Sequence, residues 1–201
     1  MEVSRRLSPA EYFAFDAASP QKHEFYNGHI VAMAGAEPEH NRIKGNVQGL
    51  MWQRLPEGCS SVTSDQRVQL DDSYVYPDLV ITCGPRRYDA NRPRTLLNPL
   101  MVIEIISPST STRDRRDKMG SYLKLLSLRE YWIVETDVAH VTQYAKHGDA
   151  WAVELLAGRA VSVESEHLSV SLTLAEIYRG LDAIADEIPW KGDGPLQEDA
   201  D

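Results

Sequence analysis

Two short apolar runs stand out in the pattern of hydrophobic and polar positions along the chain. The runs 76–82 and 99–107 are apolar at nearly every position, which is typical of strands that are buried on both faces. Each run contains one carboxylate, Asp78 in the first and Glu104 in the second. Burying an unpaired ionised carboxylate costs several kcal/mol, so such a group is usually paired, protonated or bound to a cation. Two such groups on neighbouring strands predict a metal site.

The same periodicities predict the elements of the N-terminal half. Ser8-Pro-Ala-Glu11 is a capping box with proline at the first helical position, and it predicts a short helix to about Asp16. Asn27-Gly28 predicts a tight hairpin turn. Apolar residues at helical spacing predict a helix over 38–55. The ranges 60–70 and 76–83 are expected to be strands, and the polar stretch 84–98 is expected to be a loop.

The C-terminal half adds a helix between two further strands. Strands are expected over 101–106 and 130–135, and the helix between them begins near Ser111. Lys118 borders the apolar face of that helix, so its side chain can extend toward a strand end. Short antiparallel strands follow, and the capping box Thr173–Glu176 predicts a last helix to about Ala185. The core order is therefore helix, strand, strand, strand, helix, strand, preceded by a hairpin and followed by a sheet extension.

Length and composition fit one domain. Of 201 residues, 42% are hydrophobic, and we expect residues 1–188 to form the domain and 189–201 to form an acidic, disordered tail. No apolar run has the length of a signal peptide or a bilayer-spanning segment, so we expect a cytoplasmic protein without a membrane partner. Cys59 and Cys83 have no metal-binding spacing and are expected to be unpaired core residues.

The charge distribution permits a nucleic-acid partner without requiring one. The formal net charge is -9, but much of it lies after residue 181, where acids outnumber bases. Two local basic clusters occur at 86–94 and 113–118. Most clusters of this kind are solvated surfaces, although some contact phosphates.

The candidate chemistry centres on Asp78, Glu104 and Lys118. Hard cations such as Mg²⁺, for which Mn²⁺ can substitute, prefer oxygen ligands, so Asp78 and Glu104 are the predicted metal ligands. Such a metal can activate water and stabilise charge on a phosphoryl transition state, with Lys118 adding a cation. Three residues are weaker accessory candidates: Glu24, His40 and Gln66.

Structural explanations compete with these roles. Asp78 could cap a turn or pair with an arginine, and Lys118 could form an i, i+4 pair with Asp114. Glu24 could be an exposed strand residue, and His40 could be a hydrogen-bonded structural histidine beside its helix stripe.

The order of these motifs resembles the putative restriction endonuclease family (Uma-two type) of the PD-(D/E)XK nuclease superfamily. The resemblance covers roughly residues 8–180 and rests on the following residues: Tyr76-Pro-Asp78, 102–110, Asp114, Lys118, Tyr122 and 130–134, with 24–28 and His40 in support. It implies a restriction-endonuclease-like α/β (α+β) core, a mixed sheet flanked by helices, with Asp78 and Glu104 as metal ligands and Lys118 as the catalytic lysine. The superfamily's lysine two residues after the glutamate is absent, because Ile106 occupies that position.

Three functional hypotheses follow. The first is a Mg²⁺-dependent phosphodiester hydrolase, an endonuclease acting on DNA, for which a homodimer would suit cleavage of both strands. The second is a catalytically idle binding or assembly module with the nuclease fold. The third is a magnesium-dependent hydrolase of small phosphate esters, which the overall acidity would suit better than long duplex DNA.

Overall fold

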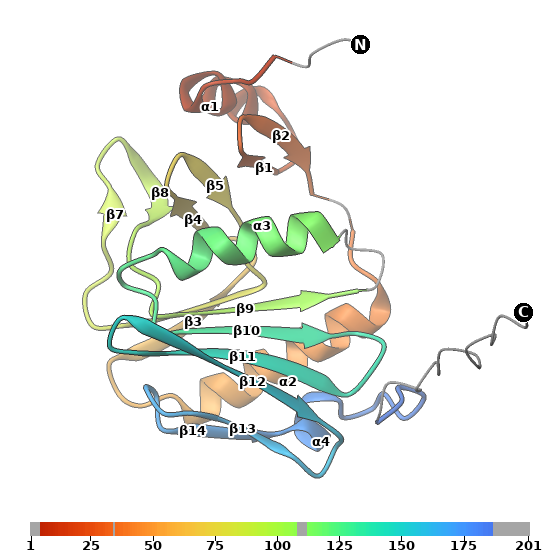
Figure 1. The fold of residues 1–201 in the computed structure, drawn as a ribbon. Coiled ribbons are helices and arrows are strands. Elements are labelled where there is room, and N and C mark those ends of the chain that lie inside the picture. The colour runs from red at the N-terminus through yellow and green to blue at the C-terminus, as the bar shows by residue number, and fades with distance from the viewer. Residues whose placement is uncertain (1–4, 34, 108–111, 187–201) are drawn as a thin grey trace, which may run out of the picture.

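The computed structural model describes residues 5–33, 35–107 and 112–186 (Figure 1). The expected helix start at Ser111 and the expected tail at 189–201 lie outside the described residues. Within the described part, helices lie between groups of consecutive strands along the chain, as in a mixed α+β fold. The helices are α1 (Pro9–Ala18), α2 (Pro38–Arg54), α3 (Thr112–Leu123) and α4 (Leu174–Ile177).

The larger sheet forms the centre of the molecule. Its strand order is β12-β11-β10-β9-β6-β3, with β9 and β10 parallel and the other neighbours antiparallel. In Figure 1 it runs across the middle of the molecule. Its strands have these bounds: β3 (Cys59–Thr63), β6 (Leu79–Cys83), β9 (Met101–Ile106), β10 (Glu130–Glu135), β11 (His140–His147) and β12 (Ala150–Ala157).

Helices cover both faces of this sheet because its strands are apolar on both sides. On one face, Ile43 and Val47 of α2 pack in a core cluster with Ile81 of β6. On the other face, Tyr122 of α3 packs in a second cluster with Val102 of β9. The two clusters use alternate residues of each strand, as the period of two along a β-strand requires.

A second sheet and α1 lie beyond α3 at the N-terminal end of the molecule (Figure 1). Its strand order is β2-β1-β5-β4-β8-β7, and α1 packs on it through a small aromatic core of Tyr12, Phe25 and Tyr74. The strands are β1 (His23–Tyr26), β2 (His29–Ala32), β4 (Arg67–Leu70), β5 (Ser73–Val75), β7 (Tyr88–Asp89) and β8 (Arg92–Leu96). A separate pair, β13 (Ser162–Ser165) and β14 (Val170–Thr173), lies beside α4.

The expected helix-strand-strand-strand-helix-strand order is present as α2, β3, β6, β9, α3 and β10. The predicted hairpin is also present, with Asn27 and Gly28 at φ 49° and 83°, the positive values that a two-residue turn of this kind requires. Both capping boxes form as the sequence predicts, at Ser8–Glu11 and at Thr173–Glu176.

Four predicted elements are wrong in extent. The strand expected over 76–83 begins at Leu79, so Asp78 immediately precedes β6 instead of lying within it. The single strand expected over 60–70 is two strands in different sheets, β3 and β4, because the chain turns after Thr63, whose carbonyl accepts bonds from Asp65 and Gln66. The loop expected over 84–98 contains β7 and β8, which pair through their backbones despite few apolar side chains. The last helix ends at Ile177 instead of Ala185, and Gly180 at φ 79° follows its end.

The prediction that Cys59 and Cys83 are unpaired is also wrong. They occupy directly opposed positions of β3 and β6, with Cα atoms 4.0 Å apart, and they form a disulfide. Their separation of 24 residues carries no sequence signal, so only the strand register reveals the pairing.

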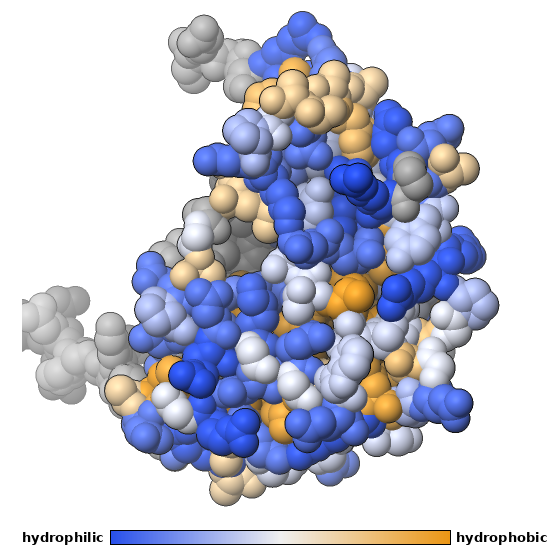
Figure 2. Space-filling model, turned by 180° about the vertical axis from the view of Figure 1, so that it is seen from behind, coloured by the Kyte–Doolittle hydropathy of each residue, from blue (hydrophilic) through white to orange (hydrophobic). Residues whose placement is uncertain are grey.

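The surface offers no single large apolar face in the view of Figure 2. That face is mostly hydrophilic, and its hydrophobic residues form small separate groups. Within the described ranges, no helix is both long enough and apolar enough to cross a membrane.

Candidate active site

The register of β6 and β9 brings the two predicted carboxylates together. Leu79 pairs with Ile103, so Asp78, the residue before β6, and Glu104 of β9 each lie one residue beyond that pair on the same side. The Asp78 amide donates a hydrogen bond to Glu104 Oε2 (3.3 Å), and the Ile105 amide donates one to Asp78 Oδ2 (2.9 Å). The backbone of each strand end therefore holds the carboxylate of the other.

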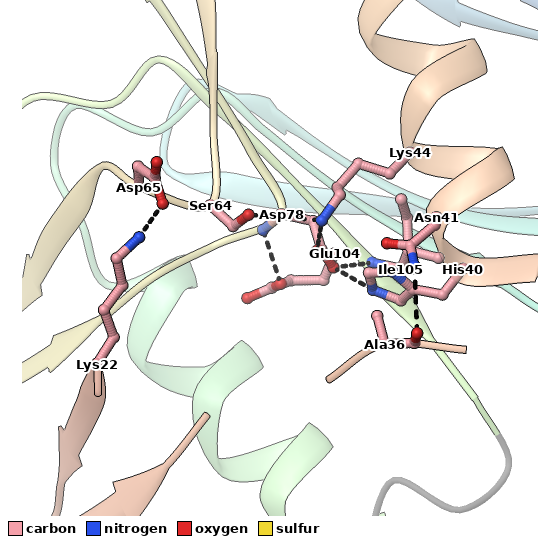
Figure 3. A network of polar contacts seen from close by, with 10 residues as sticks. All are labelled: Lys22, Ala36, His40, Asn41, Lys44, Ser64, Asp65, Asp78, Glu104 and Ile105. Atoms are coloured by element: carbon pink, nitrogen blue, oxygen red, sulfur yellow. Dashed lines mark hydrogen bonds and ion pairs between the residues drawn. The ribbon is translucent and has the colours of Figure 1, made fainter. Parts of the chain in front are cut away.

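Helix α2 adds a histidine and a lysine to Asp78. His40 Nε2 lies 3.0 Å from Asp78 Oδ2, and Lys44 Nζ lies 3.8 Å from Asp78 Oδ1 (Figure 3). The two side chains point the same way because residues four apart share one face of a helix. Lys44 also donates to Ser64 Oγ at 3.4 Å, beyond the end of β3.

A second set of contacts joins α3 to the small sheet. Lys118 Nζ donates to Glu24 Oε2 (2.5 Å), and Glu24 Oε1 accepts a bond from the Tyr76 amide (3.0 Å). Glu24 is 8% exposed, so the explanation of this residue as an exposed strand position is wrong. Tyr122, one turn of α3 beyond Lys118, donates to Glu104 Oε1 at 2.8 Å.

These side chains line one open cavity of about 700 Å³, called the cleft below. Its acidic and basic side chains are Glu24, Glu37, His40, Lys44, Asp78, Glu104 and Lys118. Carboxylates outnumber lysines on this lining. The cleft therefore has an unbalanced negative charge, which favours binding of a cation.

Electrostatics within the cleft act most strongly on Glu104. Burial, together with the neighbouring carboxylates of Asp78 and Glu24, raises the pKa of Glu104 to about 8, although Lys118 and the hydrogen bond from Tyr122 act to lower it. Tyr122, whose own pKa burial also raises, stays protonated and donates to the Glu104 carboxylate. A bound cation would favour the ionised form of Glu104 and release a proton.

The donor set suits a magnesium ion that retains waters. In the described part of the chain, no three His, Cys, Asp or Glu side chains are grouped as a complete metal centre. Mg²⁺ commonly binds through one or two carboxylates, with waters and substrate phosphates completing its octahedron. Asp78 and Glu104 fit that requirement.

The cleft gathers five of the six residues named from the sequence. Asp78, Glu104, Lys118, Glu24 and His40 line it, whereas Gln66 does not: its amide donates to the backbone carbonyls of Arg67 and Arg94. Sequence reasoning did not select Lys44 as a site residue. Lys44 lies four residues after His40 on the predicted helix, and this spacing could have indicated that both side chains share one helix face.

The architecture and this cleft define a restriction-endonuclease-like class of fold. A solved structure from Anabaena variabilis ATCC 29413, described as a putative nuclease belonging to DUF820, aligns with a TM-score of 0.67 at 17% sequence identity. The alignment covers 86% of this chain and 97% of that chain. This likeness confirms the fold class expected from the sequence.

Residues 9–176 match the sequence profile of the Uma2 family, described as "Putative restriction endonuclease", and the chain belongs to that family. Two uncharacterized proteins of Synechocystis sp. (strain ATCC 27184 / PCC 6803 / Kazusa) are similar along most of their length. The protein slr1290 is 31% identical, and the alignment covers 88% of this chain and 93% of slr1290. The protein sll1609 is 28% identical, and the alignment covers 84% of this chain and 97% of sll1609.

Proposed function

We propose that the protein is a metal-dependent endonuclease that hydrolyses phosphodiester bonds in DNA. The observation that carries this proposal is the convergence of Asp78 and Glu104 in one open cleft with two lysines. Membership of a family described as "Putative restriction endonuclease" supports the same reaction class. Mg²⁺ is the proposed cofactor, because the two carboxylates are hard oxygen ligands.

Each side chain has a distinct task in this proposal. Asp78 and Glu104 would hold the metal, which when bound activates water and offsets charge on the phosphate. His40 and the Ile105 amide fix the orientation of Asp78, and Tyr122 fixes that of Glu104. Lys44 and Lys118 provide positive charge for the phosphate oxygens.

Glu24 positions Lys118 instead of contacting the substrate. Its second oxygen accepts a bond from the Tyr76 amide, so the carboxylate is fixed before Lys118 binds it. A lysine held in this way needs less reordering when the phosphate arrives. The hairpin that carries Glu24 is thereby part of the active site.

The proposal is tested by cleavage of DNA with matched carboxylate variants. Purified protein should nick supercoiled plasmid and cut single-stranded DNA in Mg²⁺ or Mn²⁺, and not in EDTA. Asp78→Asn and Glu104→Gln should each lower the rate about 100-fold or more while the circular dichroism spectrum is retained. Glu57→Gln, an exposed carboxylate outside the cleft, is the control and should cleave normally.

Metal binding gives a readout that does not depend on cleavage. Titration calorimetry without DNA should detect Mn²⁺ binding to the wild-type protein and much weaker binding to Asp78→Asn. Because Glu104 must lose its proton to ligate the metal, the affinity should increase as the pH rises toward about 8. Equal affinity in the variant would contradict the assignment of Asp78.

The choice of substrate separates the competing hypotheses. Cleavage of a chromogenic phosphodiester without any cleavage of plasmid, single-stranded DNA or RNA would favour a hydrolase of small phosphate esters. Metal binding with no cleavage of any of these substrates would favour an idle module with the nuclease fold.

A further inference from the structure

A second cavity of about 580 Å³ lies beside the cleft. It is formed by the end of α1, the turn between β3 and β4, and strand β8. This side cavity is defined by Phe13, Asp16, Lys22, Arg67, Tyr76 and Arg94, with Asp65 at its edge. None of the proposed metal ligands or lysines of the cleft lines it.

The side cavity and the cleft share a wall. Tyr76 lines both cavities, and the two neighbouring residues Ser64 and Asp65 line one each, Ser64 the cleft and Asp65 the side cavity. Figure 3 shows the pair of Lys22 and Asp65 next to Ser64, which accepts a bond from Lys44, and Lys44 in turn pairs with Asp78. A chain passing through the cleft would therefore meet the side cavity within a short distance of the carboxylates.

The charge of the side cavity is opposite in sign to that of the cleft. Three basic side chains line it, and two of them pair with acids: Arg67 with Asp16 at 3.1 Å, and Lys22 with Asp65. Arg94 is exposed and has no ion pair among the described residues. One positive charge is thus left over, next to a cleft in which negative charge predominates.

Aromatic rings accompany these cations. The guanidinium carbon of Arg67 lies 4.7 Å from the centre of the Phe13 ring and 5.9 Å from that of Tyr76. Lys22 Nζ also lies 5.9 Å from the Tyr76 ring centre. Flat rings interleaved with cations are the usual surface on which proteins hold unpaired bases and their phosphates.

Gln66 gives this cavity a rigid wall. Its side-chain amide donates to the carbonyls of Arg67 (2.9 Å) and Arg94 (3.0 Å), which lie on the parallel strands β4 and β8. Arg67 Nε also donates to Thr95 Oγ1 at 3.0 Å, across the same two strands. The two arginines therefore project from backbones that are fixed relative to each other.

We propose that the side cavity binds an unpaired nucleotide flanking the phosphodiester bond in the cleft, so that the substrate is single-stranded or locally unpaired DNA. The inference rests on the proposed nuclease function and specifies its substrate. A base in an intact duplex stays stacked and cannot enter such a cavity. Arg94 would contact the phosphate, and the base would lie against the Tyr76 side chain, which lines the cavity.

Binding measured in a cleavage-deficient background tests this proposal. Fluorescence anisotropy with the Glu104→Gln protein should show tighter binding of a labelled single-stranded oligonucleotide than of a blunt duplex hairpin. Adding Arg94→Ala should weaken single-strand binding about fivefold to tenfold and Arg94→Lys much less, because only the charge needs to be kept. Arg179→Ala, which removes an exposed arginine that lines neither cavity, is the matched control.

Kinetics in the cleavage-competent protein give a second readout. Arg94→Ala should raise KM for single-stranded DNA by a larger factor than it lowers kcat, whereas the control Arg179→Ala should change neither. Equal affinity for single strand and duplex, or no effect of Arg94→Ala, would overturn the inference even if the wild-type protein cleaves DNA. Arg94-dependent binding without any cleavage would refute the nuclease proposal and retain the nucleotide site.

Discussion

Glu104 has a carboxylate whose two oxygens are held by different parts of the chain. Oε1 accepts from the Tyr122 hydroxyl on α3, and Oε2 accepts from the Asp78 amide beside β6. Both bonds favour the ionised form, whereas burial and the nearby carboxylates oppose it. A single substitution that alters these contacts should therefore shift the pKa of Glu104 and with it the pH dependence of activity.

We expect Tyr122→Phe to move the rising limb of the pH–rate profile to higher pH. The hydrogen bond from Tyr122 lowers the pKa of Glu104, so its removal lets burial raise that pKa further. Since the ionised carboxylate is the proposed metal ligand, more alkaline conditions would be needed for the same activity. Measurement of kcat/KM against pH checks this expectation. Tyr144→Phe is the control, because burial alone raises the pKa of Tyr144 and no hydrogen bond of its hydroxyl contributes. An unchanged midpoint of the pH–rate profile in Tyr122→Phe would contradict the prediction.

At this scale, the sequence predicts some site residues and not others. Asp78 and Glu104 are visible because a carboxylate in an apolar run has few structural explanations. Glu24, which is only a weaker candidate on sequence grounds, sits in a short hairpin strand with no such context, and its contact with Lys118 spans 94 residues. Lys44 likewise reaches Asp78 only after α2 packs on the sheet. Contacts of that kind leave no local pattern.

Helix α4 depends on one carboxylate at its start. Glu176 accepts bonds from the amide and hydroxyl of Thr173, and it also pairs with Arg54 at the end of α2. The Arg54 guanidinium, together with the Thr173 bonds, holds the pKa of Glu176 down to about 2. The same side chain thus caps one helix and ties it to another.

We expect Glu176→Gln to destabilise the protein by about 1 kcal/mol at neutral pH, a magnitude typical of a lost helix cap. Because the pKa is depressed in the folded state, this stabilisation is fully present above about 4.5 and is lost as the pH falls toward about 2. The difference between wild type and variant should therefore shrink in acid. Urea unfolding from pH 7 to pH 3 measures it. A constant difference across that range would show that ionisation of Glu176 is not responsible.

Elements with a strong local signal were predictable, and elements defined by pairing were not. The two capping boxes and the Asn27-Gly28 turn fix their structures within a few residues. The alternation of apolar and polar residues over 60–70 continues through the turn at Asp65. The pattern therefore predicts one strand, although the chain passes from one sheet to the other there. A period of two reports that a segment is extended, and it does not report which partner it has.

The cleft lies where the two sheets meet, so its integrity depends on both. The small sheet supplies Glu24, and its core is only three aromatic residues, Tyr12, Phe25 and Tyr74, with a few partly buried neighbours. The larger sheet supplies Asp78 and Glu104 from a much larger core. A second sheet was not predicted, because its strands are short and several are polar.

We expect Phe25→Ala to lower both stability and activity. Phe25 is 1% exposed, and truncation of a buried phenylalanine costs about 3–5 kcal/mol. The adjacent Glu24 would lose its fixed position and release Lys118. Thermal unfolding and plasmid nicking measure the two effects. Phe15 is 46% exposed, so Phe15→Ala is the control and should alter stability and nicking much less. Normal nicking by a folded Phe25→Ala protein would refute the link to Glu24.

The ion pair between Glu24 and Lys118 joins residues 94 positions apart, and Tyr26 bonds to Ser121 across 95. Contacts that close such long loops form late in folding, because the chain loses the entropy of loop closure before the contact stabilises the structure. Partly folded chains would then lack the complete catalytic constellation. Under the proposed function, a nascent polypeptide on the ribosome would have no complete site until α3 had emerged and docked, so that immature molecules would not cleave the DNA of their own cell.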